Sequence, residues 1–141
     1  MILDSSILVA KERGRFALDA FLAAHPHESF FLSAVTVSEL WHGVERATPS
    51  ARKVKREQLV REWLADFAVM EFDAQVARLH ARIWAELEIR GTVIGSHDLL
   101  IAATALHYNQ DIATLNAREF SRVDGLHLAE VAPFVLPKTS E

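Results

Sequence analysis

The stretch from Gly95 to Leu106, GSHDLLIAATAL, decides both the fold and the candidate site of this sequence. Its apolar side chains predict a buried helix, yet an acidic residue, Asp98, stands in the first turn. A carboxylate among so many apolar side chains costs desolvation free energy unless a cation or a hydrogen-bond donor meets it. Asp98 is therefore a candidate functional residue.

Two further acids occur in similar apolar surroundings. Asp4 ends the segment MILD, and Glu39 lies within AVTVSELWHG. Each acid also has a purely structural explanation. Asp4 could cap a helix, Glu39 could complete a capping box with Thr36, and Asp98 could complement a helix dipole.

The composition is typical of a soluble globular protein. The chain has 141 residues, of which 50% are hydrophobic and 24% are charged, and it has no cysteine. Disulfides and thiolate metal sites are therefore excluded. No apolar run approaches the roughly 18 residues of a membrane span, and the N-terminal apolar run is too short for a signal peptide, so we expect a cytoplasmic protein. We expect one domain over residues 1–136 and a polar tail over 137–141.

Short apolar segments alternate with helical patterns along the chain. The expected strands are residues 1–4, 30–32, 68–72, 111–114 and 126–129. The segments between the earlier strands carry apolar side chains at helical spacing. This alternation predicts an α/β fold in which helices cover both faces of a parallel sheet.

The predicted topology brings the acids together. Asp4 and Glu39 follow the first and second strands, so they belong to the carboxyl edge of the sheet. Asp98 begins a helix that leads into the fourth strand, so its end of the helix returns to the same edge. Asn116 and Glu119, which follow the fourth strand, belong there too.

Crowded carboxylates favour a divalent cation over three separate structural roles. Like charges at one edge repel and raise one another's pKa unless a cation neutralises them. Oxygen ligands without cysteine or paired histidine indicate Mg²⁺, with Mn²⁺ as a substitute. The sequence contains no HExxH motif, Walker lysine or GxSxG motif, so the other common catalytic patterns are not supported.

One basic segment stands out in a chain of net charge −4. The expected helix over residues 50–67 carries Lys53, Lys55 and Arg56, which could contact RNA phosphate. The simpler interpretation is a solvated helix face.

Four segments, MILDSS, SELWHGVERA, IGSHDLLIAATAL and TLNAREF, resemble PIN-domain ribonucleases in order and spacing, specifically the VapC-type toxins of toxin–antitoxin systems. The likeness spans nearly the whole chain. It implies a PIN-like three-layer α/β/α fold, with a parallel five-stranded sheet of order 3-2-1-4-5. It also implies a homodimer and a VapB-like antitoxin that occupies the active site.

The resemblance assigns roles to individual residues. Asp4, Glu39 and Asp98 match the family's acids, which hold Mg²⁺, and Ser6 matches the residue that supports the first acid. Either Asn116 or Glu119 completes the site; we expect Glu119 to be catalytic and Asn116 to be supporting.

The implied activity is metal-dependent cleavage of structured RNA. The first candidate substrate is tRNA and the second is rRNA. Water activated by the metal attacks in line and leaves 5′-phosphate and 3′-hydroxyl ends. Two other functions remain open: a non-catalytic α/β binding module, in which the acids are structural, and a metal-dependent phosphohydrolase of small molecules.

Overall fold

Four short parallel strands form the centre of the protein in a computed structural model, which describes residues 1–138. They are β1 (Ile2–Leu3), β2 (Phe31–Ser33), β3 (Ala68–Met70) and β4 (Ile112–Ala113), in the order β3-β2-β1-β4. The predicted α/β class, the parallel pairing and the order of these four strands are confirmed.

The prediction of a fifth strand over residues 126–129 is wrong. The segment meets the sheet at a single parallel bridge between Ile112 and Leu128. The backbone N–H of Ile112 donates to His127 (3.1 Å), and that of Ala129 donates to Ile112 (2.9 Å). The segment therefore lies where a fifth strand would lie, beside β4. It pairs at one position because β4 is only two residues long.

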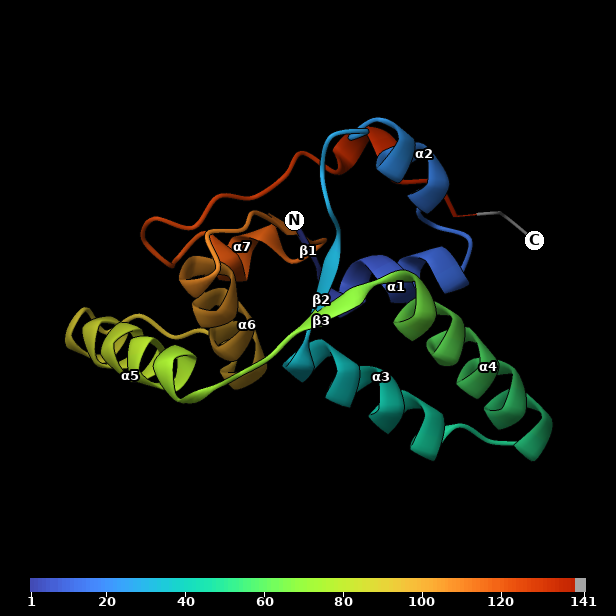
Figure 1. The fold of residues 1–141 in the computed structure, drawn as a ribbon, viewed down its shortest axis with the longest axis horizontal. Helices are drawn as coiled ribbons and strands as arrows, with labels where there is room; N and C mark the ends of the chain where they lie inside the picture. The colour runs from blue at the N-terminus through green and yellow to red at the C-terminus, as the bar shows by residue number, and fades with distance from the viewer. Residues whose placement is uncertain (139–141) are drawn as a thin grey trace.

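Helices cover the sheet on two sides, as Figure 1 shows. Helices α1, α2 and α4 pack into one apolar cluster and α5, α6 and α7 into the other. Their bounds are α1 (Ser5–Glu12), α2 (Leu18–Ala23), α3 (Ala34–Arg46), α4 (Ser50–Asp66), α5 (Ala74–Ile89), α6 (Ser96–His107) and α7 (Ala117–Phe120), followed by a 3-10 turn, η1 (Ala132–Phe134).

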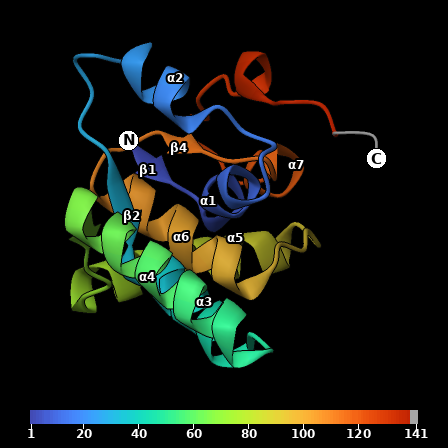
Figure 2. The same cartoon turned by 90° about the vertical axis from the view of Figure 1, so that its right-hand side faces the viewer.

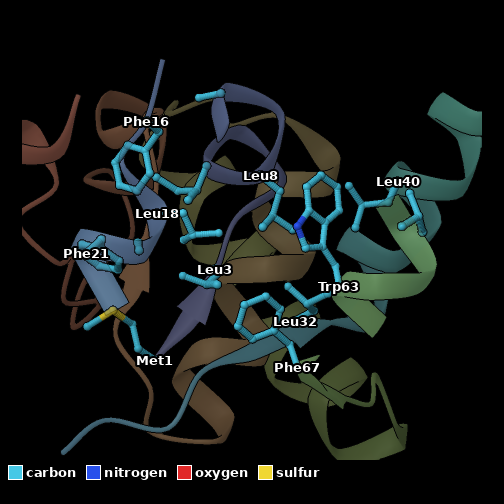
Figure 3. Packing of buried hydrophobic residues seen from close by; sticks show 14 of the residues in the cluster. Met1, Leu3, Leu8, Phe16, Leu18, Phe21, Leu32, Leu40, Trp63 and Phe67 are labelled. Atoms are coloured by element: carbon cyan, nitrogen blue, oxygen red, sulfur yellow. The ribbon is translucent and has the colours of Figure 1, made fainter. Parts of the chain in front are cut away.

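The two clusters meet at the strands because successive side chains of a strand point to opposite faces. Ile2 belongs to the cluster under α5 and α6, whereas its neighbour Leu3 belongs to the cluster under α1 and α4. Figure 3 shows the cluster under α1 and α4, in which Leu3 and Leu32 from the strands lie near Trp63 from α4. Apolar burial on both faces of the sheet thus fixes the orientation of β1, and with it the position of Asp4, the next residue along the chain.

Helices α3 and α4 pack side by side and extend away from the sheet, as Figure 2 shows. Helix α4 ends at Asp66, one residue before the predicted end of the basic helix. Among the described residues, no helix combines the length and apolar character that a membrane span requires. The expected tail over 137–141 falls mostly on residues 139–141, which lie outside the described part of the chain.

Candidate metal centre

Asp4 lies directly after β1 and is only 4% exposed. It stands at the N-cap position of α1, but its side chain caps nothing. Instead its Oδ2 accepts hydrogen bonds from the hydroxyls of Ser6 (2.7 Å) and Thr114 (2.8 Å). The structural explanation of Asp4 as a helix cap is therefore wrong, and the predicted contact between Ser6 and the first acid is present.

The two hydroxyls are held in place by backbone donors from the segment that follows β4. Leu115 N–H donates to Ser6 Oγ (3.0 Å), and Asn116 N–H donates to Thr114 Oγ1 (2.9 Å). Because each hydroxyl oxygen accepts from the backbone, its single proton remains for Asp4. Thr114, which is 2% exposed, was missed from the sequence. The signal was a hydroxyl residue at the end of an expected strand.

Glu39 lies in the second turn of α3, where the predicted capping box does not form. Ser33 caps the helix, because its Oγ accepts from Thr36 N–H (3.0 Å). The Glu39 carboxylate instead lies near Ser5 Oγ (3.4 Å) and His97 Nδ1 (3.6 Å). Burial and the charge of Asp4 raise the pKa of Glu39, while His97 and Ser5 oppose the rise. His97 is a second neighbour of the site that the sequence did not single out.

Asp98 is the third residue of α6, which begins after Gly95 without a side-chain cap. Its Oδ2 accepts a hydrogen bond from Asn116 Nδ2 (2.8 Å). Burial first, and then the charges of Asp4, Glu39 and Glu119, raise the pKa of Asp98 to about 6. The helix dipole still favours an acid at this position, but it does not account for three neighbouring carboxylates.

The fourth position is divided between two residues. Asn116 contacts Asp98 directly. The Glu119 carboxylate accepts from Gly95 N–H (3.3 Å) and lies 3.4 Å from Arg122 Nη1, so part of its charge is compensated. Asn116 therefore orients an acid, whereas Glu119 adds negative potential beside it.

The structure thus gathers Asp4, Glu39, Asp98 and Glu119 at the carboxyl edge of the sheet, and we call these four residues the acidic edge. Within residues 1–138, no three acidic or histidine side chains already enclose a position for a metal ion. The donor chemistry nevertheless fits a hard cation, because carboxylate oxygens predominate, and because burial and neighbouring carboxylates raise the pKa of Glu39 and of Asp98.

The candidate RNA-binding residues lie on α4 and are not part of the acidic edge. Two of them have acidic neighbours: Lys53 Nζ lies 3.5 Å from Glu45, and Arg56 Nη2 lies 2.8 Å from Glu12. Lys55 is exposed, and no carboxylate of the described residues pairs with it. The three residues are therefore not equivalent, and Lys55 is the most available to an external anion.

Comparison with known sequences identifies the family of the chain. The PIN domain pattern matches residues 1–126. Ribonuclease VapC1 of Rickettsia felis is 30% identical over 132 residues, which cover 94% of this chain and 96% of that protein. The tRNA(fMet)-specific endonuclease VapC of Salmonella typhimurium is 30% identical over 99 residues, covering 70% of this chain and 73% of that protein.

Solved structures show the same fold. VapBC2 from Rickettsia felis, bound to a DNA fragment from its promoter, matches with a TM-score of 0.82 and 26% identity, covering 91% of this chain and 96% of that chain. FitAcB from Neisseria gonorrhoeae matches with a TM-score of 0.80 and 29% identity, covering 91% and 96%. Because the PIN pattern spans most of the sequence and a full-length relative aligns along almost its whole length, the chain belongs to the PIN-domain family.

Proposed function

We propose that this protein is a metal-dependent endoribonuclease toxin of a VapBC-like toxin–antitoxin system. The acidic edge carries the proposal, because burial and neighbouring carboxylates raise the pKa of Glu39 and of Asp98, and such a cluster provides a place for a cation beside a phosphodiester. Relatives named as ribonucleases and as a tRNA(fMet)-specific endonuclease support RNA as the substrate. We propose tRNA as the first candidate and rRNA as the second, and we propose that the activity is cytoplasmic.

Nucleases of the PIN-domain family generally depend on a divalent metal. We propose Mg²⁺, with Mn²⁺ as a substitute, held by Asp4, Glu39 and Asp98. Such a cation would polarise a phosphoryl oxygen and lower the pKa of bound water, which would supply a nucleophile near neutral pH. Water attack would leave 5′-phosphate and 3′-hydroxyl ends.

The protein's own residues have distinct tasks in this proposal. Ser6 and Thr114 fix the rotamer of Asp4 through their two hydrogen bonds. Asn116 holds Asp98, and Glu119 strengthens the negative potential that attracts the cation. The raised pKa of Asp98 means that its carboxyl releases its proton near pH 6, so cation binding should weaken below that pH.

An RNase toxin also needs an inhibitor. Solved relatives are described as VapBC complexes, which supports a VapB-like antitoxin as the partner of this chain and a homodimer as its assembly. We propose that a basic side chain of the antitoxin enters the acidic edge and pairs with its carboxylates, as the cation otherwise would.

The deciding experiment measures cleavage of purified tRNA and rRNA by the isolated protein with Mg²⁺ or Mn²⁺, and the end groups of the products. Asp98→Asn should reduce cleavage by at least about 100-fold, whereas Asp66→Asn, the same change on the exposed end of α4, should not reduce it. A protein that cuts neither RNA with either metal would be a binding module instead. Hydrolysis of small phosphate esters without RNA cleavage would favour a phosphohydrolase.

A further inference from the structure

A groove leads away from the acidic edge along α3 and α4. Its volume is about 540 Å³, and Ser5, Glu39 and His97 lie among its lining residues. Arg46 and Arg56 also line it, while Val60 and Trp63 contribute apolar surface. The groove therefore joins a strongly negative region to a positive one.

A second hollow of about 360 Å³ adjoins the groove and shares Gly43, Arg46 and Arg56 with it. Four arginines line this hollow, and we call them the arginine pocket: Arg13, Arg46, Arg52 and Arg56. They come from the end of α1, the end of α3 and the first turns of α4. Residues far apart in sequence thus place four guanidinium groups around one hollow.

The charges of the arginine pocket are mostly uncompensated. Arg56 donates to Glu12 Oε1 from Nε (3.1 Å) and Nη2 (2.8 Å). Within residues 1–138, Arg13, Arg46 and Arg52 have no carboxylate within 4.0 Å. Gathering like charges does not stabilise a fold, so the pocket is better explained by an anionic ligand.

The spacing along α3 relates the pocket to the acidic edge. Glu39, Gly43 and Arg46 are separated by four and then three residues, so they share one side of the helix. With a rise of about 1.5 Å per residue, Arg46 lies roughly 10 Å further along the axis than Glu39. An anion in the pocket is therefore too far away to be the phosphate that reacts at the acidic edge.

The Arg56 side chain lies against α3 at Gly43. A Cβ at this position would lie 3.7 Å from Arg56 Nη1 and 3.9 Å from its Cδ. Because Glu12 accepts only from Nε and Nη2, Nη1 remains for another acceptor. Glu12 is thus a positioning residue that holds one arginine at the boundary between groove and pocket.

We propose that the arginine pocket binds a backbone phosphate of the RNA next to the one that is cleaved, and so positions the strand along the groove. This inference rests on the proposed ribonuclease function. Guanidinium groups bind phosphate in a bidentate geometry, and such contacts set register without reading sequence. RNA is favoured over an acidic peptide because the pocket is continuous with the groove that ends at Glu39.

The test compares two double variants that remove equal charge. Arg46→Ala/Arg52→Ala removes half of the pocket, and Arg78→Ala/Arg82→Ala removes two arginines that line a different hollow on α5. Both are made in an Asp98→Asn background, so that a labelled single-stranded oligoribonucleotide is bound without being cut. Affinity should fall on the order of tenfold in the pocket variant. Its slope of log K against log salt should shrink by about 0.7, the value for one phosphate contact on a single strand.

The α5 variant should keep the parental slope, and Arg46→Lys/Arg52→Lys should recover the slope but only part of the affinity. Equal slopes in the pocket and α5 variants would overturn the inference. So would a pocket variant that binds RNA normally but loses its complex with the antitoxin, since the pocket would then hold an acidic peptide. Failure of the proposed function is separate: the protein with Asp98 intact would cleave no RNA at all.

Discussion

The acidic edge has two halves that the protein stabilises differently. In the strand half, Asp4 accepts hydrogen bonds from two hydroxyls, at 2.7 and 2.8 Å. In the helix half, Asp98 accepts one from Asn116, at 2.8 Å, and its pKa rises to about 6. The strand half is therefore complete within the fold, whereas the helix half retains charge that only an external cation would neutralise.

The strand half therefore determines how rigidly Asp4 is held, and the helix half determines the affinity for a cation. Hydrogen bonds from held hydroxyls fix where Asp4 lies, and they are independent of any ligand. Uncompensated charge at Asp98 and Glu39 lowers the stability of the metal-free protein, and a cation that binds the folded state recovers it by mass action. The halves should therefore respond in opposite directions to the loss of their carboxylates.

The largest expected effect comes from removing one carboxylate from each half. Asp4→Ala and Asp98→Asn should each reduce RNA cleavage by at least about 100-fold, because each removes electrostatic stabilisation at the reacting phosphate. Without metal, Asp4→Ala should lower stability by about 1–3 kcal/mol, since two hydroxyls lose their acceptor. Asp98→Asn should not lower it. Single-turnover cleavage would measure the activity of the two variants, and thermal melting would measure their stability. If both variants lost stability, the proposed difference between the two halves would be wrong.

The next effect tests whether the hydroxyls matter only through Asp4. Thr114→Val keeps the shape of the side chain but removes its donor, and it should reduce metal affinity or activity by about 10–100-fold. Thr114→Ser keeps the hydroxyl and should retain most of the parental activity. Calorimetric titration with Mn²⁺ would compare the two variants. Equal affinities would show that Ser6 alone is sufficient to hold Asp4.

A smaller effect concerns pH. The folded pKa of Asp98, about 6, exceeds its ordinary value of 3.8, so the folded state binds more protons between these pH values. Stability of the metal-free protein should therefore fall as pH rises from about 4 to 6, by on the order of 1 kcal/mol after solvent screening. Asp98→Asn should flatten this decline, leaving a remainder from Glu39, whose pKa is also raised. Denaturant unfolding at several pH values would measure it, and an unchanged decline in the variant would contradict the assignment.

The smallest effect lies outside both halves, on α4. Lys55→Ala should reduce the salt slope of RNA binding by about 0.7, the value for a single phosphate contact. Lys53→Ala should change it less, because Lys53 already lies 3.5 Å from Glu45. Fluorescence titrations over a range of salt concentrations would distinguish them. If neither slope changes, this face of α4 is simply solvated.

The sequence was sufficient for the features that depend on periodicity. Alternating strands and helices predicted a parallel sheet and placed Asp4, Glu39 and Asp98 at one edge, whereas the order of the strands was implied by the family resemblance. It was insufficient where local patterns compete. Thr36 with Glu39 matched a capping box, but α3 starts earlier, because Ser33 follows β2 and caps the helix.

Tertiary contacts account for the rest. Thr114 meets Asp4 across 110 positions of sequence, so no local pattern could have indicated the hydrogen bond. Arg13, Arg46 and Arg52 likewise gather only because α1, α3 and α4 converge. The sequence analysis considered the basic residues of one helix, α4, and so did not include Arg13, which follows α1.

The two hydroxyls on Asp4 also limit its denticity. Both donate to Oδ2, and no buried side-chain polar atom of the described residues lacks a partner, so Oδ1 is not sealed from solvent. A carboxylate held in this way can offer a cation one oxygen rather than two. The orientation of two hydroxyl protons thus decides which oxygen of Asp4 faces an external ligand.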